Sequence, residues 1–268
     1  MDIFQAILLG IVQGLTEFIP VSSSGHLEIV QHIFGFSGEN FHLFLEFINL
    51  GTLLALLIYF HKRIWKIIKN VFRERNYKLA INIVITSIPA GLAGLLLASW
   101  IEDNDFFSSL FTVSIAMGLV GLVMIFIDRV PHMSDLKDEN QLTPKRALII
   151  GLSQVLALIP GTSRSGTTIV TGRIVGLNSE SAAEYSFLAS IPIMCGVCLK
   201  MFLSEKGRIY FAENIDILFF SNLVAFIVGM FALHYVLKYL KQPKSLQSFG
   251  RYRVVVACLV LGTMLILA

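Results

Sequence analysis

Six stretches of the chain are apolar over the length that a membrane-spanning helix needs. A helix crosses the hydrocarbon core of a bilayer with roughly 20 apolar residues. The six stretches are residues 43–60, 79–100, 107–127, 183–203, 216–237 and 252–268. This pattern predicts an all-α polytopic membrane protein with six transmembrane helices.

Two further apolar segments are each divided by a polar turn into pieces that are too short to cross. Segment 3–36 is broken by a serine-rich turn after Pro20, and segment 147–176 is broken by "PGTSRSG". Irregular backbone is tolerated at membrane depth only where protein buries it or where it lines a wet cavity. We expect each segment to form a re-entrant helical hairpin. The alternative is that both turns are loops outside the membrane.

The two interrupted segments also resemble each other. "GIVQGLTEFIPVSSSG" and "GLSQVLALIPGTSRSG" both have a Gln three residues after a Gly, then Ile-Pro, a turn rich in Ser or Thr, and a final Gly. Their prolines, Pro20 and Pro160, are 140 residues apart, which is close to half of the chain.

Each half of the chain, 1–127 and 128–268, therefore contains one hairpin followed by three spans. An odd number of crossings turns the second half upside down relative to the first, which defines an inverted-topology repeat. The sequence thus predicts a single membrane domain, 1–268, made of two inverted repeats.

Composition and charge agree with a membrane protein and indicate its orientation. Only 15% of the residues are charged and 55% are hydrophobic, whereas soluble domains carry about 25% charged residues. Most Lys and Arg lie in 61–78, 128–146 and 238–253, and residues 1–42 have none. Positive loops stay in the cytoplasm, so the first hairpin enters from outside and the second from the cytoplasm. No stretch combines dense Lys and Arg with aromatics, which argues against a nucleic-acid partner.

The first turn combines a carboxylate, hydroxyls and an imidazole. Gln13 and Glu17 share one helix face, and a carboxylate inside an apolar run usually marks function. Ser22, Ser23 and Ser24 precede Gly25, where a helix N-terminus provides N–H groups for an anion. His26 follows in the first helical turn and is the only titratable base within the motif.

The second turn supplies a permanent positive charge. The guanidinium of Arg164 suits phosphate, and the small residues around it let the backbone approach an anion closely. These neighbours are Thr162, Ser163, Ser165 and Gly166. No carboxylate lies in 147–176, so Arg164 pairs either with Glu17 or with a ligand. The two turns together indicate phosphoryl chemistry on an anionic substrate.

These residues carry a resemblance to a known family. "QGLTEFIPVSSSGH" and "PGTSRSG" resemble the two signature motifs of the undecaprenyl-pyrophosphate phosphatase family of the bacitracin-resistance type. The length, the hairpins and the order of spans also agree, so the resemblance covers essentially the whole chain. The family's first motif has Glu or Gln four residues before its second Glu. Here that position is Gln13, which leaves Glu17 as the only carboxylate of the motif.

The resemblance implies an enzyme of the bacterial plasma (inner) membrane that opens to the outer face. It would hydrolyse a polyprenyl diphosphate lipid, undecaprenyl diphosphate, to undecaprenyl phosphate and inorganic phosphate with a divalent cation, Mg²⁺ or Ca²⁺. Such enzymes recycle the lipid carrier of cell-wall synthesis. Carried over by position, the catalytic residues are Glu17, Ser23, His26 and Arg164, and the substrate-binding residues are Gln13, Ser22, Ser24, Gly25, Thr162, Ser163, Ser165 and Gly166. Glu17 is also the expected metal ligand, and the sequence leaves open whether the chain forms a homodimer.

The residues leave several alternatives open. Ser23 would attack the terminal phosphorus with His26 as general base, but attack by water or by His26 itself gives the same products. Inverted repeats are common in transporters, so a flippase that moves the lipid phosphate without hydrolysis is the main alternative function. The phosphatidic-acid phosphatase type is disfavoured because the residues after Arg164, "SGTTIVTGR", lack the His and Asp of that family. A purely structural membrane scaffold would tolerate alanine in both turns.

Overall fold

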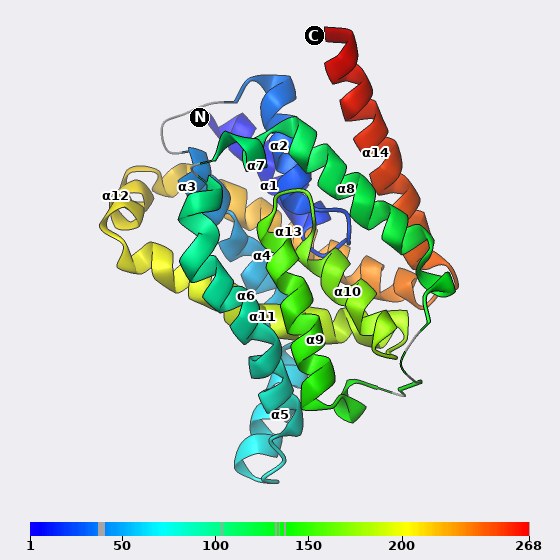
Figure 1. The fold of residues 1–268 in the computed structure, drawn as a ribbon. Helices are drawn as coiled ribbons and strands as arrows, with labels where there is room; N and C mark the ends of the chain where they lie inside the picture. The colour runs from blue at the N-terminus through cyan, green and yellow to red at the C-terminus, as the bar shows by residue number, and fades with distance from the viewer. Residues whose placement is uncertain (37–40, 103, 132, 134, 137, 268) are drawn as a thin grey trace.

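Every regular element is a helix in the computed structural model, which describes residues 1–36, 41–102, 104–131, 133, 135–136 and 138–267 (Figure 1). The helices up to residue 125 are α1 (Ile3–Thr16), α2 (Ser23–Phe34), α3 (Phe41–Phe47), α4 (Asn49–Tyr59), α5 (His61–Phe72), α6 (Lys78–Glu102), α7 (Asp105–Ser108) and α8 (Leu110–Ile125).

The remaining elements include three short 3-10 helices. In chain order they are η1 (Ile127–Arg129), η2 (Glu139–Gln141), α9 (Pro144–Val155), η3 (Leu156–Leu158), α10 (Arg164–Ile174), α11 (Ser179–Leu203), α12 (Glu205–Glu213), α13 (Ile215–Leu240) and α14 (Ser245–Leu267).

Five helical stretches of the described chain have the length and hydropathy of membrane spans. They are Phe41–Tyr59, Lys78–Leu97, Ser179–Leu203, Ile215–Leu240 and Ser245–Ile266. The sixth expected span, 107–127, contains α8, which is apolar but has only 16 residues. The expectation of an all-helical polytopic membrane protein is therefore confirmed at this coarser level.

The first of these stretches is interrupted in its middle. Helix α3 ends at Phe47 and α4 begins at Asn49, with Ile48 as the intervening residue. The side-chain amide of Asn49 donates to the carbonyl oxygens of Leu45 (2.9 Å) and Glu46 (3.2 Å). Carbonyls at the end of a helix lack an internal partner, so Asn49 satisfies the polar groups that the interruption exposes.

Both turn-bearing segments fold into pairs of helices. Helices α1 and α2 contact each other across the first turn, and α9 and α10 do so across the second. Helix α1 packs against α13, and α9 packs against α6. Glycine makes both approaches close, because a Cβ at Gly10 or Gly151 would meet the backbone of Ser221 or of Thr86. Each short helix thus lies along a long helix from the other half of the chain.

The two turns are held together by a third pair of helices. Helices α8 and α14 pack along each other (Figure 1). A Cβ at Gly161, in the second turn, would meet the backbone of Val113 in α8. A Cβ at Gly25, after the first turn, would meet the sulfur of Met117 on the same helix. Helix α8 therefore contacts both turns and holds them side by side.

Candidate active site

The helices that follow the two turns begin in the same way. Ser22 and Ser163 are their N-cap residues, and each has a positive φ, 80° and 73° respectively. The Ser22 hydroxyl accepts the Gly25 N–H at 3.2 Å, and the Ser163 hydroxyl accepts the Gly166 N–H at 3.1 Å. A positive φ costs about 1–3 kcal/mol outside glycine and persists only where surrounding structure fixes it. Both turns are therefore strained in the same place.

The first helical residues are the ones that the sequence singled out. Ser23 is the first residue of α2, and Arg164 is the first residue of α10. A helix N-terminus leaves N–H groups without internal partners and carries a partial positive charge. Two such N-termini meet here, which favours an anion between them.

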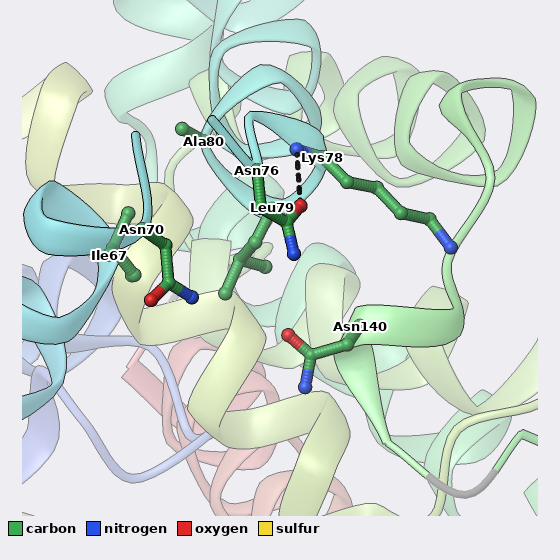
Figure 2. Close-up of a pocket in the computed structure, with 7 residues that line it drawn as sticks. All are labelled: Ile67, Asn70, Asn76, Lys78, Leu79, Ala80 and Asn140. Atoms are coloured by element: carbon green, nitrogen blue, oxygen red, sulfur yellow. Dashed lines mark hydrogen bonds between the residues drawn. The ribbon is translucent and has the colours of Figure 1, made fainter. Parts of the chain in front are cut away.

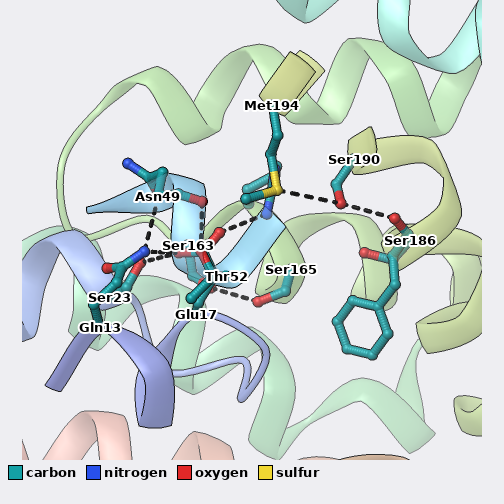
Figure 3. A network of polar contacts seen from close by, with 12 residues as sticks. Gln13, Glu17, Ser23, Asn49, Thr52, Ser163, Ser165, Ser186, Ser190 and Met194 are labelled. Atoms are coloured by element: carbon teal, nitrogen blue, oxygen red, sulfur yellow. Dashed lines mark hydrogen bonds and ion pairs between the residues drawn. The ribbon is translucent and has the colours of Figure 1, made fainter. Parts of the chain in front are cut away.

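The carboxylate of Glu17 joins the two turns (Figure 3). Its Oε2 atom accepts hydrogen bonds from the Ser23 hydroxyl at 2.7 Å and from the Gln13 side-chain amide at 3.0 Å. Its Oε1 atom forms an ion pair with the Arg164 guanidinium at 2.6 Å. Only 10% of the Glu17 side chain and 20% of the Arg164 side chain are exposed. The sequence predicted that Arg164 pairs with Glu17 or with a ligand, and in this structure its partner is Glu17.

Asn49, which the sequence analysis did not single out, extends this network. Its Oδ1 atom accepts a hydrogen bond from Gln13 at 2.9 Å, and its amide binds the end of α3. Gln13 is only 1% exposed, so its amide has no ready exchange with solvent. The interruption between α3 and α4 thus orients Gln13, which in turn holds the carboxylate of Glu17.

His26 binds groups other than Ser23. Its Nδ1 atom lies 2.7 Å from the Ser22 carbonyl oxygen, and its Nε2 atom lies 2.8 Å from the Tyr252 hydroxyl. A carbonyl oxygen only accepts, so Nδ1 carries the proton and Nε2 accepts from Tyr252. The two rings are stacked, with their planes at 3° and centroids 5.6 Å apart. The base that we expected beside Ser23 therefore lies against α14, and Ser23 contacts Glu17.

A cavity of about 190 Å³ opens beside the carboxylate. It is lined by Glu17, Ser23, Ser24, Ala157, Ser163, Arg164 and Ser165. A water molecule takes about 30 Å³ of liquid, so this space admits a phosphate group. The other expected residues do not line the cavity: Ser22, Gly25, Thr162 and Gly166 belong to the two turns and the helix starts that follow them, and Gln13 and His26 lie outside the lining as well.

The chain alone offers a divalent cation few ligands at this place. Among the described residues that line the cavity, Glu17 is the only carboxylate. Across the described part of the chain, no group of three or more His, Cys, Asp and Glu side chains is placed to hold a metal. Mg²⁺ commonly takes one or two carboxylates and completes its shell with substrate phosphates and water. Glu17 suits that arrangement only if a phosphorylated substrate brings the other oxygens.

A second crevice, of about 50 Å³, lies at the N-terminal end of α6 (Figure 2). Its polar lining consists of three asparagines and Lys78, and the Lys78 N–H donates to the Asn76 side-chain oxygen at 3.3 Å. Among the described residues that line it there is no carboxylate, imidazole or hydroxyl that could act as an acid, base or nucleophile. This crevice is therefore not a candidate for the chemistry.

One expectation about charge is wrong. Arg253 was counted among the cytoplasmic charges of the loop 238–253, but α14 already begins at Ser245 and Arg253 is 0% exposed within it. In sequence it stands close to Arg251 at the start of a span, which is where a positive-inside charge is normal. Only the packing of α14 shows that its side chain points inward.

Comparison with known proteins gives matches over nearly the whole chain. The family described as bacitracin resistance protein BacA matches residues 6–259. Undecaprenyl-diphosphatase 1 of Clostridioides difficile (strain 630) is 38% identical, with 98% of this chain and 96% of the relative covered. Undecaprenyl-diphosphatase of Enterococcus faecalis is 36% identical, with 97% of each covered, and that of Pseudomonas aeruginosa (strain UCBPP-PA14) is 35% identical, with 97% and 93% covered.

Proposed function

Because the chain belongs to the bacitracin resistance protein BacA family, we propose that it hydrolyses undecaprenyl diphosphate to undecaprenyl phosphate and inorganic phosphate. It is then a phosphoric anhydride hydrolase that returns the lipid carrier of bacterial cell-wall synthesis to use. The names of the relatives support the substrate, and the apolar helices support its membrane setting.

One observation at the site carries this proposal. A hydroxyl from one turn and a guanidinium from the other bind the same carboxylate, at 2.7 Å and 2.6 Å. This contact supports roles for Ser23 as nucleophile, Glu17 as proton acceptor and Arg164 as phosphate-binding cation around one cavity. These are the groups that phosphoryl transfer requires, because the reaction depends on positioning and on neutralising charge.

Substrate binding would change the partner of Arg164. The terminal phosphate of the diphosphate enters between the N-termini of α2 and α10 and competes with Glu17 for the guanidinium. Once Arg164 binds phosphate oxygens, the carboxylate of Glu17 is free to accept the proton of the Ser23 hydroxyl. The arginine thus neutralises the anion and releases the base in one movement.

The chemical step then follows from the Ser23–Glu17 contact. Ser23 Oγ attacks the terminal phosphorus while its proton passes to Glu17. The bond from that phosphorus to the bridging oxygen breaks, and undecaprenyl phosphate leaves with the bonding electrons. Water then hydrolyses the phosphoserine to inorganic phosphate. His26, which we expected to act as the base, would instead orient the Ser22 carbonyl and Tyr252. Direct attack by a water in place of Ser23 gives the same products without a phosphoserine.

A divalent cation, Mg²⁺ or Ca²⁺, is part of the proposal. Its chemistry would be to neutralise the diphosphate and polarise its terminal phosphorus. Glu17 would be its only protein carboxylate, and the remaining ligands would be substrate oxygens, hydroxyls and water. Removal of the cation should therefore weaken substrate binding and leave the protein fold largely unchanged.

We also propose the finer topology that the sequence predicted. Helix α8 would be a sixth, short span, and the pairs α1–α2 and α9–α10 would be re-entrant hairpins in two inverted repeats, 1–127 and 128–268. The matching N-caps and the matching packing of α1 on α13 and of α9 on α6 support this arrangement. The site would open to the outer face of the inner membrane.

The proposal is tested with purified protein in detergent. Released inorganic phosphate is measured from undecaprenyl diphosphate with added Mg²⁺, with added Ca²⁺, and with EDTA. We expect release with a cation and none with EDTA. Detergent removes compartments, so a flippase without hydrolysis would release no phosphate under any of the three conditions, and that outcome would refute the proposed function.

A further inference from the structure

Arg253 is a fully buried arginine whose hydrogen bonds all go to backbone carbonyls. Its Nε atom donates to Met117 at 3.1 Å, and its Nη1 atom donates to Pro20 at 3.2 Å. Its Nη2 atom donates to Gly161 at 2.8 Å and to Thr162 at 3.0 Å. One side chain on α14 therefore joins the first turn, the second turn and helix α8.

Burial of the Arg253 charge costs free energy, which an opposite charge would normally offset. A buried charge is usually paired with an opposite charge. Within the described residues, Arg253 has no ion pair, and the four carbonyl oxygens provide its only hydrogen-bond partners. It is also not a lining residue of the Glu17 cavity. Neither pairing nor direct contact with a substrate accounts for it.

The carbonyls that Arg253 binds lie next to the strained residues. Pro20 is two residues before Ser22, and Thr162 is immediately before Ser163, the two N-caps with positive φ. Strained backbone persists only where neighbouring structure fixes it. The Arg253 contacts fix the peptide that enters Ser163 and the peptide one residue before the one that enters Ser22. They therefore also set where Ser23 and Arg164 begin their helices.

We propose that Arg253 is a positioning residue that locks the two turns together, so that Ser23 and Arg164 reach opposite oxygens of the Glu17 carboxylate. This inference rests on the proposed function for its effect on turnover, but its geometric part stands on the carbonyl contacts alone. Arg253 acts through the turns and does not touch the substrate.

The shape of the guanidinium explains why an arginine is needed. Its five N–H groups are fixed in one plane and point in several directions. A lysine carries three N–H groups on a single nitrogen, which cannot reach carbonyls on three separate segments. Arg253→Lys would keep the charge but lose the hydrogen bonds that join the two turns. This variant therefore separates the effect of charge from that of geometry.

The first test compares Arg253→Lys and Arg253→Met with Arg251→Met, an exposed arginine on the same helix. Displacement of a catalytic group by an ångström can cost about 10²-fold in rate, so we expect kcat to fall about 10-fold for lysine and about 10²-fold for methionine. Because binding groups remain present, KM should change by less than about threefold. Arg251→Met should behave as wild type. A kcat for Arg253→Met near the wild-type value would overturn the proposal.

The second test uses chemical rescue and keeps the proposal falsifiable if the methionine variant folds poorly. Arg253→Ala leaves a space bounded by the four carbonyls, which free guanidinium can fill. We expect guanidinium chloride at low, non-denaturing concentration to restore kcat at least about 10-fold, whereas ammonium chloride at equal ionic strength should not. Failure of guanidinium to restore activity to any Arg253 variant would show a general packing role and overturn positioning.

Amide hydrogen exchange gives a readout that does not depend on activity. Segments 18–25 and 159–166 should exchange faster in Arg253→Ala than in wild type, and guanidinium should slow them again, while the exchange of α13 stays constant. If wild type releases no phosphate, the proposed function fails but this exchange result still decides the positioning role. Unchanged amide exchange in both turns of Arg253→Ala would refute the positioning role of Arg253.

Discussion

Ser23 and Arg164 begin two different helices and bind different oxygens of the same carboxylate. Ser23 Oγ donates to Oε2 of Glu17 at 2.7 Å, and Arg164 Nη2 donates to Oε1 at 2.6 Å. Their N-caps, Ser22 and Ser163, have similar dihedral angles. Corresponding positions of two similar turns thus carry different groups, a hydroxyl from one turn and a guanidinium from the other.

The serines of the first turn should differ in importance. Ser23 contacts Glu17, whereas the Ser24 hydroxyl bonds Ser22 and accepts the Gly161 N–H at 3.4 Å. Ser23→Ala removes the nucleophile and should lower kcat by at least about 10³-fold, while Ser24→Ala should cost about 10-fold or less. Phosphate release by the two purified variants checks this. Equal activities would contradict Ser23 as the nucleophile.

Glu17 should tolerate no neutral substitute. Glu17→Gln keeps the shape but cannot accept the Ser23 proton, so kcat should fall by about 10²–10⁴-fold. Glu28, on α2, lines a different groove, and Glu28→Gln is the matched control with activity near wild type. The assay is initial phosphate release at saturating substrate. A Glu17→Gln variant as active as Glu28→Gln would exclude Glu17 as the base.

Gln13 offers a test of the cation. Its amide donates to Glu17 at 3.0 Å, and Gln13→Glu would replace this donor by a second carboxylate beside the first. Two carboxylates bind a divalent cation more tightly than one, so the Mg²⁺ concentration for half-maximal activity should fall several-fold. Titration of EDTA-treated enzyme with Mg²⁺ measures it, with Gln13→Leu as the uncharged control. A half-maximal concentration that is the same or higher in Gln13→Glu would argue against cation binding at Glu17.

The second turn should depend on a glycine. Gly161 has a φ of 91°, and a Cβ there would meet the backbone of Val113. Gly161→Ala should therefore cost about 1–3 kcal/mol of stability from the dihedral angle alone, and it should lower activity by displacing the turn. A Cβ at Gly91, in the interior of α6, would meet no described atom within 4 Å other than its chain neighbours and the backbone of its own helix, so Gly91→Ala is the control. Thermal denaturation in detergent should show a lower midpoint only for Gly161→Ala.

The sequence predicted the elements whose cause is local. Apolar runs of spanning length and the punctuation by Pro20 and Pro160 gave the long helices and both turns. The boundaries moved where a helix extends beyond its apolar run: α14 begins at Ser245, not at residue 252, and its first turns combine polar and apolar residues. The polar residue Asn49 stands beside Ile48 in the run 43–60, but only the structure shows that the helix is interrupted there.

The parts of the site that sequence missed depend on packing between distant segments. Arg253 fell in a range counted as cytoplasmic charge, and Asn49 fell inside the expected span 43–60. Both act through groups far away in the chain, the carbonyls of Gly161 and Thr162 in one case and the Gln13 amide in the other. Spacing along the chain carries no signal for such contacts.

The most direct measurement of the central claim is the rate of phosphate release by Arg164→Ala. The wild-type enzyme, Arg164→Ala and Arg173→Ala are purified in detergent and given undecaprenyl diphosphate with Mg²⁺. Arg173 lies at the other end of α10, where it binds the Leu177 carbonyl oxygen and Asp128. If the guanidinium of the second turn neutralises the phosphate that the hydroxyl of the first turn attacks, Arg164→Ala should release phosphate at least about 10²-fold more slowly than wild type. Arg173→Ala should be close to wild type. Phosphate release by Arg164→Ala at the wild-type rate would contradict the account.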